Sequence, residues 1–187
     1  MKHVINTFEE ISRNFSTLSD NCSEDINKAA ELIILSLQNN GKIMFCGNGG
    51  SASDSQHLSS ELVGKYQMKR KPISSIALTT DTSAITAISN DFSFNDIFSR
   101  QIEALGKEGD VLYATSTSGK SKNILNAIKK ANELKIKTIG LTGINDSNMH
   151  SMCDIVIKAP SLRTDRIQEM HIAIGHVICE LIEKRLC

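Results

Sequence analysis

A carboxylate and an imidazole lie four residues apart in this sequence, at Glu61 and His57. If the segment is helical, four residues make slightly more than one turn, so both side chains project from the same face. Such a pair can move protons on a substrate, but it can equally be a surface contact. The pair follows closely on a glycine-rich loop, and this position favours a role at a ligand site.

A second set of polar side chains lies near the C-terminus, in an otherwise apolar segment that we expect to be helical from about residue 164 to 186. At about 100° per residue, Asp165, Gln168 and His176 fall within an arc of roughly 80° on one face. His171 falls about 140° from His176, so we expect it to serve packing or a subunit contact. The three aligned side chains indicate either a binding site or a hydrogen-bonded buried histidine.

The loop before His57 is rich in glycine, and from residue 42 the chain reads KIMFCGNGGSAS. Glycines in such a loop permit backbone angles that other residues avoid and let a ligand approach the main chain. The helix that follows would direct its free amides at an anion or a polyol. Three residues are candidates to cap that helix: Ser51, Ser53 and Asp54. A tight turn between a strand and a helix, without a ligand, is the alternative.

Two nucleotide-binding patterns are nearly present but incomplete. The glycine loop fits G-x-G-x-x-G/A, yet the segment about twenty residues later, QMKRKP, has no acidic residue to hold a ribose. A second loop contains GKS at 119–121, but the P-loop pattern requires glycine at position 114, where alanine stands. The sequence therefore disfavours a nucleotide at either loop.

The second loop carries a group of hydroxyl side chains: Ser116, Thr117, Ser118 and Ser121. Hydroxyls and the free amides of a following helix can hold a phosphate without lysine or arginine. We therefore interpret this loop as a candidate phosphate site, with a merely polar, capped turn as the alternative.

Both loops need a scaffold that brings them to one place. Five short apolar runs with little alternation predict strands, at 42–47, 74–78, 110–115, 137–143 and 153–160. Helical spacing of apolar residues predicts helices over 2–18, 24–39, 95–105, 121–134 and 164–186. Buried strands separated by helices indicate a parallel sheet covered on both faces, and ligands of such folds bind outside the C-terminal strand ends.

The composition excludes several classes of function. Lysine plus arginine equal aspartate plus glutamate at 21 each, aromatic residues make up 4% and tryptophan is absent, so we expect no nucleic-acid or anionic-membrane partner. Five cysteines without a CxxC pair argue against a disulfide framework or a structural zinc knot. The N-terminus has no apolar signal region and no stretch is long enough to span a membrane. We expect a single-domain protein in the cytoplasm.

Four motifs in order resemble the sedoheptulose 7-phosphate isomerases, or phosphoheptose isomerases, of the sugar-isomerase (SIS) superfamily. They are GNGGSASDSQHLSSE, SNDFSFNDIFSRQI, STSGKS and TDRIQEMHIAIGH, and the resemblance runs from about residue 2 to 186. It implies one SIS domain over residues 1–187, an α/β fold built as a three-layer αβα sandwich on a five-stranded parallel sheet. It further implies N-terminal helices within 1–40 that serve packing and oligomer contacts, and a homotetramer with active sites at subunit boundaries.

The resemblance also implies roles for individual residues. Glu61 matches the catalytic base and His176 the partner acid. Positions that match substrate contacts are Asn48, Gly49, Gly50, Glu61, Asn90, Asp91, Asp165 and Gln168, and the phosphate site matches Ser116, Thr117, Ser118 and Ser121. Some relatives bind zinc through residues that match His57, Glu61, Gln168 and His176, which implies one zinc per subunit. Lys65 and Lys120 depart from the arginine and the asparagine that relatives carry, and a lysine is a point charge, not a rigid fork.

The implied reaction converts D-sedoheptulose 7-phosphate into D-glycero-D-manno-heptose 7-phosphate, the first step toward the heptose of bacterial surface polysaccharide. A carboxylate and an imidazole suit it, because the carbonyl moves from C2 to C1 through an enediol by proton transfers. The alternative is a non-catalytic SIS protein that binds a replication initiator or a sugar phosphate. In a relative of that kind the positions of Glu61 and His176 hold no acid/base pair, so their presence here favours the enzyme. Other SIS isomerases act on pentose or hexose phosphates, and physics alone does not determine the sugar length.

Overall fold

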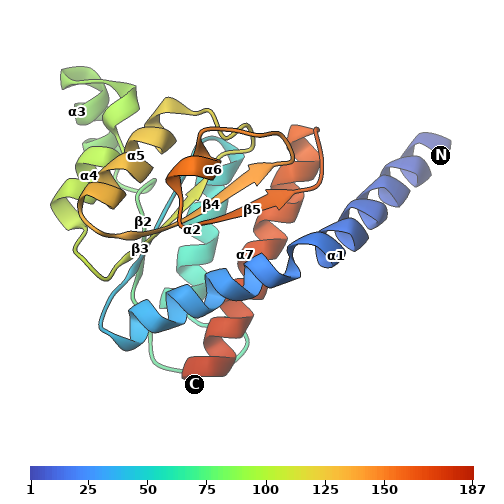
Figure 1. Cartoon of the computed structure of the whole chain (residues 1–187), viewed down its shortest axis with the longest axis horizontal. Helices are drawn as coiled ribbons and strands as arrows, with labels where there is room; N and C mark the ends of the chain where they lie inside the picture. Colours follow the sequence, from blue (N-terminus) through green and yellow to red (C-terminus); the bar gives the residue numbers. More distant parts are fainter.

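Five parallel strands form one sheet at the centre of the computed structural model, which describes residues 1–187 (Figure 1). The strands are β1 (Ile43–Gly47), β2 (Ser75–Ala77), β3 (Val111–Thr115), β4 (Lys137–Gly143) and β5 (Ile155–Ala159). They lie in the order β2-β1-β3-β4-β5. After β1 the chain forms β2 at one edge of the sheet, and it then returns to the other side of β1 to form β3. The switch point of the sheet lies between β1 and β3, where Gly47 is paired with Thr115.

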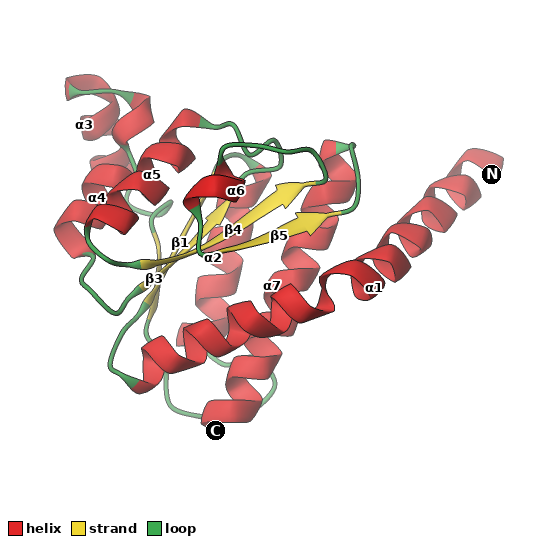
Figure 2. Cartoon of the chain, in the orientation of Figure 1, coloured by secondary structure: helices red, strands yellow, loops and turns green.

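Helices cover both faces of the sheet (Figure 2), which confirms the predicted three-layer sandwich. They are α1 (Lys2–Gln38), α2 (Gly50–Val63), α3 (Thr82–Asp91), α4 (Ser99–Leu105), α5 (Lys122–Glu133), α6 (Met149–Met152) and α7 (Thr164–Leu186), with a 3-10 turn at Phe94–Asp96. One core packs α1, α2 and α7 against Phe45 and Tyr113. The other packs α4, α5 and α6 against Met44 and Leu112. Alternate residues of β1 and β3 enter opposite cores, and this explains why these strands are apolar without alternation.

The N-terminal region differs from the prediction, because α1 is one continuous helix and not two. The prediction of helices over 2–18 and 24–39 was wrong in treating the polar segment between them as a break. That segment contains neither proline nor glycine. Leu18, Cys22 and Ile26 continue a single buried stripe, and the Cys22 thiol donates to the Lys158 carbonyl of β5 at 3.3 Å. Packing against β5 therefore carries the helix through the polar residues.

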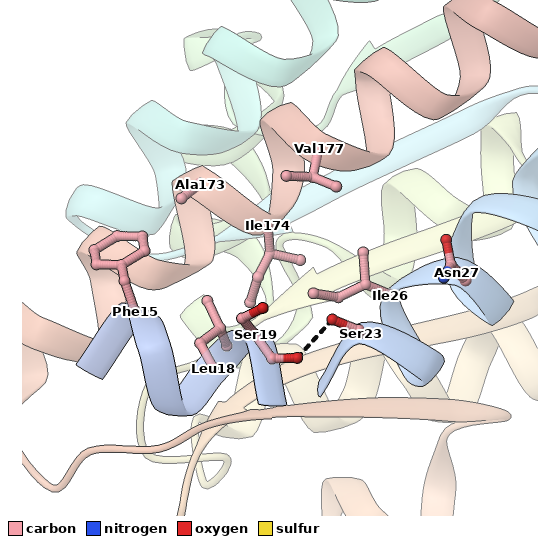
Figure 3. A pocket seen from close by; sticks show the side chains of 9 residues that line it. All are labelled: Phe15, Leu18, Ser19, Ser23, Ile26, Asn27, Ala173, Ile174 and Val177. Atoms are coloured by element: carbon pink, nitrogen blue, oxygen red, sulfur yellow. Dashed lines mark hydrogen bonds between the residues drawn. The ribbon is translucent and has the colours of Figure 1, made fainter. Parts of the chain in front are cut away.

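The first turns of α1 extend beyond the rest of the chain (Figure 1) and expose Val4, Ile5 and Phe8. Further along, α1 and α7 form a groove of about 260 Å³. Its apolar lining residues are Phe15, Leu18, Ile26, Ala173, Ile174 and Val177 (Figure 3). No helix of the chain combines the length and the hydropathy needed to cross a membrane.

Candidate active site

The glycine loop joins β1 to α2 at the switch point of the sheet. Gly49 has φ +56°, in the left-handed region that favours glycine. A Cβ on Gly50 would overlap the Gln168 amide, so this position brings the loop backbone against α7. The prediction that Ser51, Ser53 or Asp54 caps this helix was wrong, because α2 begins at Gly50 and no side chain caps it. The capping position is occupied by Gly49, and the three polar residues lie within the first turns.

Side chains of α2 and α7 form a cluster where these two helices pack against each other. One ligand atom each from His57, Glu61 and His176 lies within 4.8 Å of the others. His57 Nε2 is 3.1 Å from Glu61 Oε1, and the His57 and His176 rings are 5.1 Å apart between centroids. The two helices approach closely because Gly175 has no side chain. A Cβ at position 175 would overlap the Leu58 side chain.

Asp54 belongs to this cluster, although we had expected it to be a capping residue. Its carboxylate accepts a hydrogen bond from Gln168 Nε2 at 3.3 Å. Burial raises the pKa of Asp54. The hydrogen bond from the Gln168 amide and the nearby His57 and His176 rings lower it again, but only in part. The spacing could have revealed it, because Asp54 precedes His57 by three residues and Glu61 by seven, on the same helix face.

The serine loop joins β3 to α5 and lies beside the glycine loop. Ser116 Oγ donates to Ser121 Oγ at 3.2 Å, and the Lys120 amide donates to Ser118 Oγ at 3.2 Å. Ser121 precedes the first turn of α5 without capping it through its side chain, so the amides there can bind an anion. The hydroxyls thus converge at the start of a helix, as an anion site requires.

An amide pair connects the two loops. Asn48 Nδ2 donates to Asn123 Oδ1 at 2.9 Å, and Asn123 Nδ2 donates back to Asn48 Oδ1 at 2.8 Å. Asn123 is 2% exposed, so these reciprocal bonds satisfy a buried amide. Sequence reasoning did not identify Asn123. Its only signal was an amide on the otherwise apolar face of α5, beside Ile124 and Ala127.

Comparisons with known proteins agree with this geometry. A family model described as SIS domain matches residues 7–143. The phosphoheptose isomerase of Rhodospirillum rubrum is 51% identical over 173 residues, which cover 92% of both chains. That of Campylobacter jejuni is 54% identical over 159 residues, 85% of this chain and 86% of the relative. This chain belongs to the phosphoheptose isomerase family of SIS-domain enzymes. The solved structure of phosphoheptose isomerase GmhA from Neisseria gonorrhoeae has a TM-score of 0.92 at 42% identity and covers 98% of each chain.

Three predicted substrate contacts of this phosphoheptose isomerase family member lie away from the cluster. Asn90 and Asp91 end α3, are exposed and bond to each other at 2.8 Å. Asp165 pairs with Arg163 at 2.6 Å and Arg166 at 3.1 Å, and the Arg163 hydrogen bond lowers the pKa of Asp165 to about 2. No hydrogen bond or ion pair joins these three residues to the cluster. Their roles in the family's reaction stay predictions.

The two histidines of α7 have opposite surroundings in this isomerase. His171 is 2% exposed, and its Nε2 donates to the Thr142 carbonyl at 3.0 Å. Burial lowers the pKa of His171 to about 4, which keeps the ring neutral. His176 is partly exposed and has the Tyr66 ring stacked on it at 5.8 Å between centroids. The expectation that His171 serves packing is confirmed.

The cluster has the donor atoms of a metal site. His57, Glu61 and His176 offer two imidazoles and a carboxylate within 4.8 Å, a set that zinc and related divalent ions accept. Gln168 belongs to the same helix as His176, and its amide nitrogen donates to Asp54 at 3.3 Å, which leaves its amide oxygen available. Three of the four predicted ligands therefore fit a metal ion, and the part of Gln168 stays a prediction.

Proposed function

We propose that this chain converts D-sedoheptulose 7-phosphate into D-glycero-D-manno-heptose 7-phosphate, a step that supplies heptose for bacterial surface polysaccharide. The observation that carries the proposal is the approach of a carboxylate and an imidazole, Glu61 on α2 and His176 on α7, whose ligand atoms lie within 4.8 Å of one another. The glycine loop packs against Gln168 of the same helix α7. Relatives named phosphoheptose isomerase match almost the whole chain.

Glu61 acts as the base. Its carboxylate takes the proton from C1 of the ketose, which leaves an enediol, and returns a proton to C2 to complete the aldose. His176 moves the remaining proton from the C1 oxygen to the C2 oxygen, so atoms and charges balance. General acid–base groups of this kind each contribute about 10²- to 10⁴-fold in rate.

The two loops bind the substrate. Ser116, Ser118 and Ser121, with Thr117, hold the phosphate through hydroxyls and the first amides of α5. Asn48 with the backbone of Gly49 and Gly50 faces the sugar. Because the amide pair connects Asn48 to Asn123 on α5, the sugar and phosphate subsites keep a constant separation.

A zinc ion is proposed at the cluster, held by His57, Glu61, Gln168 and His176. When bound, it would polarise the substrate oxygens and stabilise the negative charge of the enediolate. An amide oxygen is a weak ligand, so we expect partial zinc content after purification. Elemental analysis measures that content, and metal-free protein with full activity and no response to added zinc would remove the metal from the proposal.

The chain is proposed to form a homotetramer with active sites at subunit boundaries. The projecting turns of α1 expose Val4, Ile5 and Phe8, and an apolar groove lies between α1 and α7. Large exposed apolar surfaces of this kind mark association sites. A second subunit would also account for the distance of Asn90, Asp91 and Asp165 from the cluster, because these residues would complete a neighbouring site.

The reaction is tested by incubating the protein with a panel of C5, C6 and C7 ketose phosphates and identifying each product. We expect isomerisation of the C7 substrate with the highest kcat/KM. A protein that binds the sugar phosphates without converting any of them would favour the non-catalytic alternative, and a preference for C5 or C6 would correct the substrate.

A further inference from the structure

The loop that follows α2, residues 64–70, is held by a buried ion pair between Arg70 and Glu183. Arg70 Nε donates to Glu183 Oε1 at 2.8 Å, and the two side chains are 3% and 2% exposed. Glu183 lies near the end of α7, seven residues after His176. A loop next to the active site is thus tied to the helix that carries His176.

Glu183 organises the loop backbone. It accepts hydrogen bonds from three successive amides, those of Tyr66 at 3.3 Å, Gln67 at 2.8 Å and Met68 at 2.9 Å. Burial alone would raise the pKa of Glu183, but these amides and Arg70 outweigh it and hold the pKa below its ordinary value. The carboxylate is therefore ionised and fully satisfied, and the loop has one favoured conformation.

Arg70 extends the connection back to α2. Its Nη2 donates to the backbone carbonyl of Glu61 at 2.7 Å, and its Nη1 donates to the carbonyl of Leu62 at 2.8 Å. The last carbonyls of a helix lack partners within the helix, and the guanidinium satisfies two of them at once. One of the two belongs to Glu61 itself.

The same loop places Tyr66 on His176. The two rings lie nearly parallel, at 23°, with centroids 5.8 Å apart. Because Glu183 binds the Tyr66 amide, one carboxylate is connected through Arg70 to the backbone of Glu61 and through Tyr66 to the ring of His176.

We propose that Arg70 and Glu183 are positioning residues for the isomerisation, which maintain the separation of the Glu61 carboxylate and the His176 ring. The inference rests on the roles proposed for Glu61 and His176. Proton transfer needs the reacting atoms within hydrogen-bond reach, and a displacement of about 1 Å can cost roughly a hundredfold in rate. No hydrogen bond or ion pair joins the serine loop to this network, so substrate binding should change little.

A merely structural ion pair would stabilise the fold without affecting catalysis. The chain contains a second buried ion pair that serves as a control for the pair of Arg70 and Glu183. Asp110 is fully buried, pairs with Lys42, and accepts the amides of Lys42 at 3.0 Å and Lys107 at 2.9 Å. It directly precedes β3, and its hydrogen bonds go to Lys42 and Lys107, not to Arg70, Glu183, Glu61 or His176. Asp110→Asn therefore perturbs a similar network without contact to Glu61 or His176.

The test compares Arg70→Lys, Glu183→Gln and Asp110→Asn by thermal unfolding and by kcat and KM with the C7 ketose phosphate, per folded subunit. We expect all three to unfold at lower temperature. Arg70→Lys keeps the charge but not the fork, so it and Glu183→Gln should lower kcat roughly ten- to a hundredfold with KM within about threefold. Asp110→Asn should keep the kcat of the parent protein.

A folded Arg70→Lys or Glu183→Gln protein with the parent kcat would overturn the proposal, and so would an equal loss in Asp110→Asn. If neither Arg70→Lys nor Glu183→Gln folds, the Tyr66→Leu variant tests the proposal. A loss of about threefold or more in kcat supports it, and an unchanged kcat overturns it. Glu61→Gln distinguishes a failure of the proposed base from a failure of the positioning role. An active Glu61→Gln protein contradicts the proposed base, whereas an inactive one beside a fully active Arg70→Lys protein contradicts only the positioning role.

Discussion

The two parts of this active site are built in different ways. The glycine and serine loops each follow directly on a strand, β1 or β3, and the groups proposed to bind the substrate come from a few consecutive residues. The proposed acid/base pair joins Glu61 on α2 to His176 on α7, more than a hundred residues apart. In the loops, several hydroxyls and amides are proposed to bind the substrate together, so the loss of one leaves the others in place. In the cluster, Glu61 and His176 each have a separate proposed role that no other group takes over. Changes in the cluster should therefore cost more than changes in the loops.

The largest effect is expected for Glu61→Gln. The amide cannot accept the proton from carbon, so kcat should fall by about 10²- to 10⁴-fold or more. Substrate affinity, measured by calorimetry, should stay close to that of the parent protein because the loops are untouched. A variant that turns over normally would remove Glu61 from the role of base.

The two histidines of α7 offer the next comparison. His176→Asn removes the partner acid and should lower kcat by about 10²-fold or more, with little change in the unfolding temperature. His171→Asn changes a buried ring bonded to Thr142 and should act on stability or assembly. Steady-state kinetics and thermal unfolding of both variants distinguish these outcomes. A well-folded His171→Asn protein without activity would mean that the wrong histidine has been assigned.

Smaller effects are expected in the serine loop. Ser118→Ala and Ser121→Ala each remove one hydroxyl, and a hydrogen bond to a charged group contributes about 1.5–3 kcal/mol. Binding of the phosphorylated sugar should weaken roughly ten- to a hundredfold, with a smaller effect on kcat. Calorimetric titration measures the change. Unchanged affinity in both variants would place the phosphate elsewhere.

The smallest effect concerns stability against pH. Burial holds the pKa of His171 at about 4 in the folded chain, below its ordinary value of 6.5. The unfolded chain therefore binds more protons, so this contribution is complete above about pH 6.5 and is lost as the pH falls toward 4. Denaturant unfolding at pH 7 and pH 5 should show a loss in the free energy of unfolding that His171→Asn reduces. Equal losses in both proteins would contradict the assignment.

The sequence predicted what depends on local pattern. Strand order along the chain, the two loops and the helix over 164–186 follow from apolar runs, glycines and hydroxyls, and the structure confirms them. The break near residue 20 was wrong because burial of Cys22 against β5 decides that segment. Asp54 could have been found from its helical spacing to His57 and Glu61. The roles of Asn123, Arg70 and Glu183 depend on partners distant in sequence, and no spacing within one helix or loop specifies such partners.

Solvent exchange at the substrate carbon tests the central claim most directly. The protein is incubated with sedoheptulose 7-phosphate in D₂O, and deuterium at C1 of the substrate and C2 of the product is followed by NMR. Transfer through Glu61 and an enediol predicts deuterium at these carbons with the parent protein and none with Glu61→Gln. Exchange by Glu61→Gln at the parent rate would show that another group removes the proton, and would contradict the account.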